Sequence, residues 1–194
     1  MPREHKTIVY TYEELSPEAQ EKARNWWREI DQFDSQYLSD IFKDTLREWG
    51  FEKGVDVWWS LNSSQGDGVA FQGSLDIPKY VNARAQDFRR MIGHVEVYVK
   101  HEGRYTHWNS MEVTVEESDS RKQLAPKDWF PGTPTEEMLS EFEEFVKEDV
   151  KDMSRELEKM GYGEIEYQNS DEVVAENIIA NEYEFTADGR RFMG

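Results

Sequence analysis

Residues 55–73 have the sequence VDVWWSLNSSQGDGVAFQG, in which apolar residues alternate with other residues on both sides of a polar stretch. The apolar residues of the first half fall on one side of an extended strand: Val55, Val57, Trp59 and Leu61. Val69 and Phe71 continue the alternation in the second half. Residues 62–68, NSSQGDG, contain the glycines and short polar side chains that a turn requires. The stretch predicts an antiparallel β-hairpin with an unusually long tip.

A second alternating stretch covers residues 94–116 and predicts another hairpin, with a two-residue turn at residues 102–103. In that register Val97 faces Trp108 on the neighbouring strand. The apolar residues change side after Trp108, so a β-bulge is expected at residues 109–110. Together the two hairpins predict an antiparallel sheet.

Apolar residues recur at helical spacing on both sides of these hairpins. The predicted helices cover residues 17–30, 37–49, 83–91, 134–160 and 171–180. Ser16 and Pro17 are a helix-start signal, and Gly50 and Gly161 stand where a helix is expected to end. Shorter extended stretches are predicted at residues 6–12, around Ile165 and at residues 183–192, the last turning at Asp188 and Gly189.

These elements predict an α+β protein in which helices cover an antiparallel sheet, with a long acidic amphipathic helix in the C-terminal half. Residues 1–117 are expected to form the core with its two hairpins, residues 118–133 a polar connector, and residues 134–194 an acidic part packed on the core. A chain of 194 residues with 37 % apolar and 13 % aromatic residues is long enough to bury such a core, so one domain is expected.

The chain contains no cysteine, which excludes a disulfide framework, a thiolate zinc site and a cysteine nucleophile. This composition suits a reducing cytosol. No apolar stretch approaches the length of a membrane span, and residues 1–12 lack the long apolar segment of a signal peptide. A cytoplasmic protein with no membrane partner is therefore expected.

Negative charge is concentrated in one part of the chain. Residues 134–188 contain eighteen Asp and Glu but four Lys and Arg, which accounts for −14 of the net charge of −18. Such a block repels nucleic acid and favours basic protein surfaces. Because mutual repulsion among these groups costs stability, we expect that a requirement other than folding favours them.

Five of these carboxylates recur at steps of three or four residues and share one face of the predicted 134–160 helix: Glu137, Glu141, Glu144, Glu148 and Asp152. Apolar residues, among them Phe142 and Val146, share the opposite face. At about 1.5 Å per residue the row spans roughly 22 Å, so it could occupy a groove built for a phosphate backbone. The alternative interpretation is an ordinary solvated helix face.

The tip of the first hairpin is a second candidate site, a ligand loop formed by Ser64, Gln65, Gly66, Asp67 and Gly68. The glycines allow backbone amides to converge and the Asp67 carboxylate to project, which suits a small ligand, an anion or a cation. The alternative is a plain turn, because glycine and aspartate at a hairpin tip more often serve a positive φ. The Lys and the following helix of a phosphate-binding loop are both missing.

No metal site, cofactor or catalytic residue is predicted. His94, His101 and His107 lie on the second predicted hairpin, but the strand parity of His101 keeps the three from converging. So many carboxylates are present that no acid and base pair can be assigned, and a carboxylate- or histidine-dependent metal hydrolase is the third hypothesis. Trp58 points away from the Trp59 side of its strand, so it is either an aromatic anchor for a partner or buried beneath a helix.

Three motifs carry a resemblance to a known family: YTYEELSPEAQEKA at residues 10–23, SQGDG at residues 64–68 and ANEYEFTADG at residues 180–189. In these motifs the chain resembles small acidic proteins encoded by bacteriophages and prophages. The resemblance implies an accessory protein that acts in the bacterial cytoplasm, where small acidic phage proteins inhibit host defence systems such as restriction or CRISPR.

The leading hypothesis is a non-enzymatic inhibitor whose acidic face mimics DNA and binds a basic, nucleic-acid-binding surface of a host protein. No direct contact with nucleic acid is expected. The alternative is a small-ligand protein that holds a nucleotide or an anion at residues 64–68. Salt distinguishes the two, because an electrostatic interface weakens strongly as the salt concentration rises, whereas a pocket with buried hydrogen bonds weakens much less.

Overall fold

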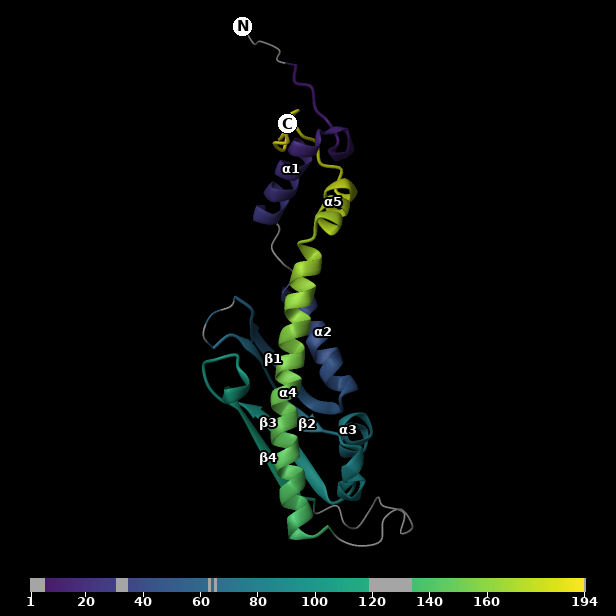
Figure 1. The fold of residues 1–194 in the computed structure, drawn as a ribbon, viewed down its shortest axis with the longest axis vertical. Coiled ribbons are helices and arrows are strands. Elements are labelled where there is room, and N and C mark those ends of the chain that lie inside the picture. The colour runs from purple at the N-terminus through teal and green to yellow at the C-terminus, as the bar shows by residue number, and fades with distance from the viewer. Residues whose placement is uncertain (1–5, 31–34, 63, 65, 119–133, 194) are drawn as a thin grey trace. The chain divides into compact units, whose positions relative to one another are not determined.

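The structure is a computed structural model that describes residues 6–30, 35–62, 64, 66–118 and 134–193 (Figure 1). The chain forms two compact units. The first, the sheet unit, comprises Ser35–Tyr162, and the second, the terminal unit, combines Met1–Asp34 with Gly163–Gly194. This division does not coincide with the predicted boundary at residues 118–133, of which residues 119–133 lie outside the described part of the chain.

The sheet unit contains a four-stranded antiparallel sheet in the order β1-β2-β3-β4. Its strands are β1 (Phe51–Ser60), β2 (Gly68–Leu75), β3 (Val95–His101) and β4 (Met111–Glu117). The helices that accompany them are α2 (Ser35–Glu48), α3 (Ile77–Arg84), the 3-10 helix η2 (Gln86–Met91) and α4 (Glu136–Gln168). In Figure 1 the long helix α4 crosses in front of the sheet. The predicted α+β class, an antiparallel sheet with helices and a long C-terminal helix, is confirmed.

The predicted first hairpin is confirmed, since β1 and β2 pair in the antiparallel direction. Val57 lies opposite Phe71 and Trp59 opposite Val69, with the polar tip between the two strands. Phe71 and Val69 are fully buried, as expected for alternate positions on the covered face of a sheet. Ala70, which points to the other face of the sheet between them, is fully buried as well, so β2 is covered on both faces at this point.

The second hairpin differs from the prediction. Val97 lies opposite Val115 rather than Trp108, so the predicted register and its two-residue turn are wrong. The tip is longer and ends in the 3-10 helix η3 (Trp108–Ser110) in place of a bulge. The Ser110 hydroxyl lies 2.5 Å from the Tyr105 carbonyl and 2.6 Å from the His107 carbonyl. These local hydrogen bonds close the tip on itself, which keeps it out of the strand ladder.

Helix α3 begins earlier than the predicted helix at residues 83–91. The Asp76 carboxylate caps its N-terminus by accepting a hydrogen bond from the Lys79 amide at 3.0 Å. Pro78 lies in the first turn, where its missing N–H leaves no hydrogen bond unmade. The predicted stretch is instead divided between the end of α3 and η2.

Gly161 does not end α4, as predicted, but lies inside it. The helix continues to Gln168, so the predicted strand around Ile165 is also wrong. A Cβ atom on Gly161 would lie 2.5 Å from the Leu61 side chain and 2.8 Å from the Phe42 ring. The glycine is therefore explained by close packing of α4 on its neighbours rather than by a left-handed helix end.

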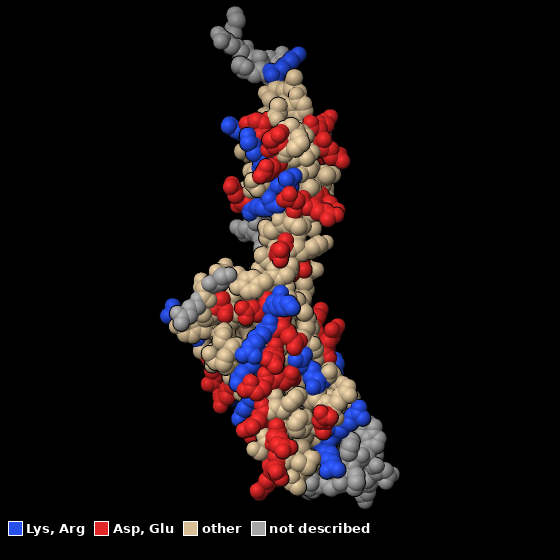
Figure 2. Space-filling model, viewed as in Figure 1, with Lys and Arg blue, Asp and Glu red and all other residues tan. Residues whose placement is uncertain are grey.

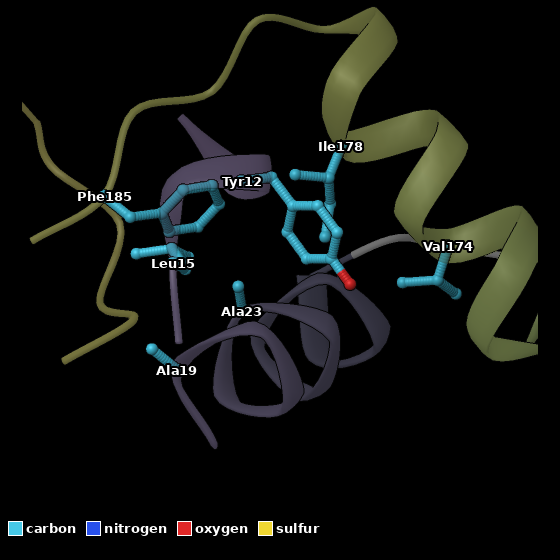
Figure 3. Packing of buried hydrophobic residues seen from close by; sticks show 7 residues of the cluster. All are labelled: Tyr12, Leu15, Ala19, Ala23, Val174, Ile178 and Phe185. Atoms are coloured by element: carbon cyan, nitrogen blue, oxygen red, sulfur yellow. The ribbon is translucent and has the colours of Figure 1, made fainter. Parts of the chain in front are cut away.

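The terminal unit has its own core, shown in Figure 3. Its elements are the 3-10 helix η1 (Tyr12–Glu14), α1 (Pro17–Ile30), the residues of α4 from Gly163 onward, α5 (Asp171–Ala180) and the C-terminal turn. Seven buried residues from η1, α1, α5 and the segments beside them form one cluster: Tyr12, Leu15, Ala19, Ala23, Val174, Ile178 and Phe185. The predicted Ser170 cap of α5 is confirmed, since the Ser170 hydroxyl accepts a hydrogen bond from the Val173 amide.

The predicted strand at residues 6–12 is wrong. Tyr10 forms an isolated antiparallel bridge with Phe185, and the chain then turns at once into η1. A second bridge joins Phe185 to Arg191, and Gly189 has a φ of +82°, so the predicted turn at the C-terminus is confirmed. None of the helices in the described part of the chain is long and apolar enough to cross a membrane.

Two glycines two residues apart in α4 provide a matched test of this packing. Gly161→Leu should lower the free energy of unfolding by about 1–3 kcal/mol, because the new side chain has no space beside Phe42 and Leu61. Gly163→Leu should raise it by roughly 0.5–1 kcal/mol, because no atom lies within 4 Å of the position of its Cβ atom and Leu favours a helix. Urea unfolding of both variants measures the difference. Equal stability of the two would contradict the close approach at Gly161.

Candidate functional site

The acidic face of α4, defined by Glu137, Glu141, Glu144, Glu148 and Asp152, is exposed to solvent at all five positions. The opposite face of the helix is buried, with Phe142, Val146 and Leu157 fully shielded from solvent. Burial of one face fixes the rotation of α4 about its axis, so the carboxylates point away from the core. The structure therefore brings the five predicted residues together on one surface.

Basic residues compensate part of this face. The Lys151 ammonium lies 2.5 Å from the Glu148 carboxylate, and the Arg155 guanidinium lies 2.7 Å from the Asp152 carboxylate. Glu137, Glu141 and Glu144 form no ion pair with any described residue. The signal for this difference is in the sequence, where bases recur every four residues along α4: Lys147, Lys151, Arg155 and Lys159. Figure 2 shows the result, since red side chains predominate toward the lower end of α4, where the helix begins.

Trp108 of η3 determines where two of these bases lie. The Lys151 ammonium is 5.2 Å and the Arg155 guanidinium 5.7 Å from the centre of the Trp108 ring. Both distances suit attraction between a cation and an aromatic face. The tip of the second hairpin thus stabilises the bases that neutralise Glu148 and Asp152, and on the acidic face only Glu137, Glu141 and Glu144 have no ion pair with a described residue.

The fold divides the acidic residues of the chain between the two units. The sheet unit carries 25 acidic and 16 basic residues and the terminal unit carries 16 and 7, so each has a net charge of −9. In the terminal unit the Asp171 carboxylate pairs with Arg28 at 2.6 Å and with Arg24 at 3.2 Å. The hydrogen bond from Arg28 and the charge of Arg24 hold the pKa of Asp171 below its usual range. Bases of α1 therefore compensate part of the acidic block.

Asp67 organises the tip of the first hairpin. Its carboxylate accepts hydrogen bonds from the Ser60 hydroxyl at 2.7 Å and from the amides of Ser64 at 2.7 Å and Asn62 at 3.0 Å. The hydrogen bond from Ser60, followed by that from the Ser64 amide, lowers the pKa of Asp67. These contacts favour the interpretation of the loop as a plain turn, because the Asp67 carboxylate already accepts hydrogen bonds from neighbouring residues of the hairpin. The predicted loop residue Gln65 lies outside the described part of the chain.

The loop nevertheless borders a cleft of about 590 Å³, lined by Gly66, Tyr105, His107, Asn109 and Ser110. The Tyr105 ring lies directly on Gly66, since a Cβ atom there would be 2.9 Å from Tyr105 Cδ1. His107 Nδ1 accepts a hydrogen bond from the Asn109 amide at 3.2 Å, which leaves His107 Nε2 for another partner. The structure thus joins the tips of the two hairpins, which sequence analysis treated as separate features.

The histidines of the described part of the chain do not assemble a metal site. No group of three or more His, Asp and Glu side chains with suitable geometry occurs among the described residues. His101 stacks on Trp58 with 4.5 Å between ring centres, and its Nε2 lies 2.9 Å from the Tyr105 carbonyl. One face of the Trp58 ring is therefore covered, and the side chain is half-buried, between the two alternatives considered from the sequence.

A partly buried ionic network was missed by sequence analysis. Arg84 of α3 donates hydrogen bonds to the Asp149 carboxylate of α4 through Nε and Nη2, and two more to Glu156 through Nη1 and Nη2. The Tyr80 hydroxyl donates to Asp149 at 2.8 Å. Burial, followed by the Asp149 charge, raises the pKa of Tyr80. Although burial lowers the pKa of Arg84, its hydrogen bonds to Glu156 and Asp149 raise it overall. All the charged groups of this network are paired, so it serves to join α3 to α4.

Comparison with known proteins gives one family match. Residues 26–172 match the family described as Domain of unknown function (DUF8835). No curated protein and no solved structure matches the chain.

The Asp67 contacts can be tested by titration. Because the pKa of Asp67 is lowered in the folded protein, its hydrogen bonds should persist above the ordinary aspartate value of about 3.9 and be lost as the pH falls through the lower, folded value. The amide proton shifts of Asn62 and Ser64, followed by NMR, should therefore titrate with a midpoint below about 3.9. In Asp67→Ala both titrations should disappear. A midpoint at or above the ordinary value would contradict the hydrogen-bonded carboxylate.

Proposed function

The chain belongs to the DUF8835 family of domains of unknown function, and we propose that it is a non-enzymatic inhibitor that binds a basic surface of a host protein through the acidic face of α4. The observation that carries the proposal is the exposed run of Glu137, Glu141 and Glu144, which has no compensating base among the described residues. The partner surface is expected to be one that binds nucleic acid.

The spacing of the carboxylates supports this choice of partner. At about 1.5 Å per residue, Glu137 and Glu144 lie roughly 10 Å apart along α4, and the full face to Asp152 extends over roughly 22 Å. Duplex DNA carries one negative charge per about 1.7 Å, so the face offers a sparser row of the same sign and a comparable length to a short stretch of duplex. Since α4 holds its buried face in the core, the row is preorganised and loses little conformational entropy on binding.

The resemblance to phage and prophage proteins supports the biological context of the proposal. An accessory phage protein in the bacterial cytoplasm meets restriction and CRISPR proteins, whose nucleic-acid grooves are basic. Occupation of such a groove by an acidic helix excludes nucleic acid directly. We therefore propose anti-defence activity by competition, with no chemical step and no cofactor.

Charge reversal tests the proposal. Affinity capture of the tagged protein from bacterial lysate at low and high salt, with mass spectrometry, identifies the partner. The triple variant Glu137→Lys, Glu141→Lys, Glu144→Lys should then bind that partner at least about tenfold more weakly, a loss of ~1.4 kcal/mol, because attraction becomes repulsion. Short duplex DNA should displace the wild-type protein from the purified partner.

The matched control reverses three exposed carboxylates of the terminal unit: Glu21→Lys, Glu176→Lys and Glu184→Lys. The control has the same change in net charge, so a loss confined to the α4 variant locates the interface. Unchanged binding by the α4 variant, or no displacement by DNA, would refute the proposal.

The cleft between the hairpin tips favours a second candidate function, the binding of a nucleotide or an anion. Its volume of about 590 Å³ is in the range of small-molecule sites, and Tyr105, His107 and Asn109 bring an aromatic ring and polar groups together. In this alternative the ligand is sequestered without being altered.

A panel of nucleotides and inorganic anions tests the cleft by NMR. A bound ligand should shift the amides of Gly66 and Ser110, and His107→Ala should weaken that binding about tenfold by removing one hydrogen bond to an ionised ligand. The control is His94→Ala, because His94 lies just before the N-terminal end of β3, whereas the cleft lies beyond the C-terminal end of this strand. If no compound shifts the amides at the tips, this second function is excluded for the compounds used.

A further inference from the structure

A pocket of about 480 Å³ lies within the terminal unit, between α1 and the C-terminal turn. Its lining residues are Lys22, Trp26, Ile30, Gly189, Arg190, Arg191 and Met193. Three of these side chains are cationic, although the terminal unit as a whole has a net charge of −9. No local pattern predicts the pocket, because its two walls are more than 150 residues apart in the chain.

The two walls are held together by tight packing. Lys22, Trp26 and Ile30 recur every four residues and form one stripe along α1. The facing wall depends on Gly189, where a Cβ atom would lie 2.2 Å from the Ala19 carbonyl oxygen of α1. The turn is closed by the hydrogen bond from the Gly189 amide to the Thr186 carbonyl at 2.9 Å. The position of the basic residues that follow is therefore fixed by the core of the unit.

The three cations are not equivalent. Arg190 pairs with Asp188 at 3.0 Å, whereas neither Lys22 nor Arg191 forms an ion pair with any described residue. The Arg191 guanidinium lies 4.4 Å from the centre of the Tyr183 ring and 5.1 Å from that of Trp26. An aromatic ring attracts the face of a guanidinium but leaves its N–H groups, which lie in the guanidinium plane, without acceptors. Arg191 is thus held in place and still able to donate.

The remaining lining is apolar and accessible. Ile30 is 47 % exposed and Met193 is 81 % exposed, and both border the pocket together with Trp26. Sites for small molecules are commonly of this kind, with apolar walls and a few polar groups that fix the ligand's orientation. A guanidinium beside an ammonium selects an anionic group, because both can donate charge-assisted hydrogen bonds to a phosphate or a carboxylate.

We propose that this pocket binds a small organic anion, with its phosphate or carboxylate group on Lys22 and Arg191 and its apolar or aromatic body on Ile30 and Met193. The site is separate from the acidic face of α4 and from the cleft between the hairpin tips, since all its residues belong to the terminal unit. The pocket would allow a protein of net negative charge to bind an anionic ligand.

Calorimetric titration of the full chain with four probes tests the site: adenosine monophosphate, phenylacetate, inorganic phosphate and adenosine. At least one of the two organic anions should bind at least tenfold more tightly than inorganic phosphate and adenosine. Inorganic phosphate lacks the apolar or aromatic body, and adenosine lacks the anionic group. Tighter binding of the nucleotide identifies a phosphate ligand, and tighter binding of phenylacetate identifies a carboxylate ligand. No binding of either organic anion, or binding no tighter than that of inorganic phosphate, would overturn the proposal.

Variants locate the binding. Lys22→Gln should weaken the binding of the preferred anion at least about tenfold, and since Lys22 is exposed and unpaired among the described residues, the variant should fold normally. Arg191→Gln should have at least the same effect. The control is Arg90→Gln, an exposed arginine of η2 in the sheet unit. The anion should also shift the NMR amide signals of Gly189 and Arg190 but not those of Gly66 and Ser110. Unchanged affinity in Lys22→Gln would refute the site.

Discussion

Burial of the apolar face of α4 in the sheet unit is the interaction on which the rest of the structure depends. Five side chains on this face are almost completely shielded from solvent: Phe142, Val146, Val150, Met153 and Leu157. Each contributes about 1.5–3 kcal/mol, more than an exposed ion pair on the same helix. With this face buried, the carboxylates on the opposite side must point to water. The acidic surface is therefore a geometric consequence of core packing.

Several other charged groups form hydrogen bonds within the protein. Asp149 joins α3 to α4 through Arg84, Asp67 closes a hairpin tip, and Asp171 joins α5 to α1. Groups engaged in this way have their hydrogen bonds satisfied and contribute to stability rather than to recognition. Glu137 at the start of α4 and Arg191 in the terminal unit are different, because no described residue neutralises either of them.

The two proposed binding surfaces have opposite signs and lie on different units. An acidic helix face suits a broad protein surface, where many weak, salt-sensitive contacts act together. A cationic pocket with an aromatic wall suits a small anion, where few contacts act in a partly desolvated space. Each unit has its own core, so a substitution on one surface is expected to leave the other intact.

The sequence by itself determined the α+β class, four of the helices, the two strands and polar tip of the first hairpin and the exposure of the acidic face. Each of these follows from local periodicity, which decides the side of an element that is buried. Only the tertiary structure decided the register of the second hairpin, the path of α4 through Gly161 and the position of Trp108 beside Lys151 and Arg155. It alone also placed Gly189 against Ala19, which creates the cationic pocket. These features depend on contacts between residues far apart in the chain, and no local pattern specifies which distant side chain will fill, or leave open, a given space.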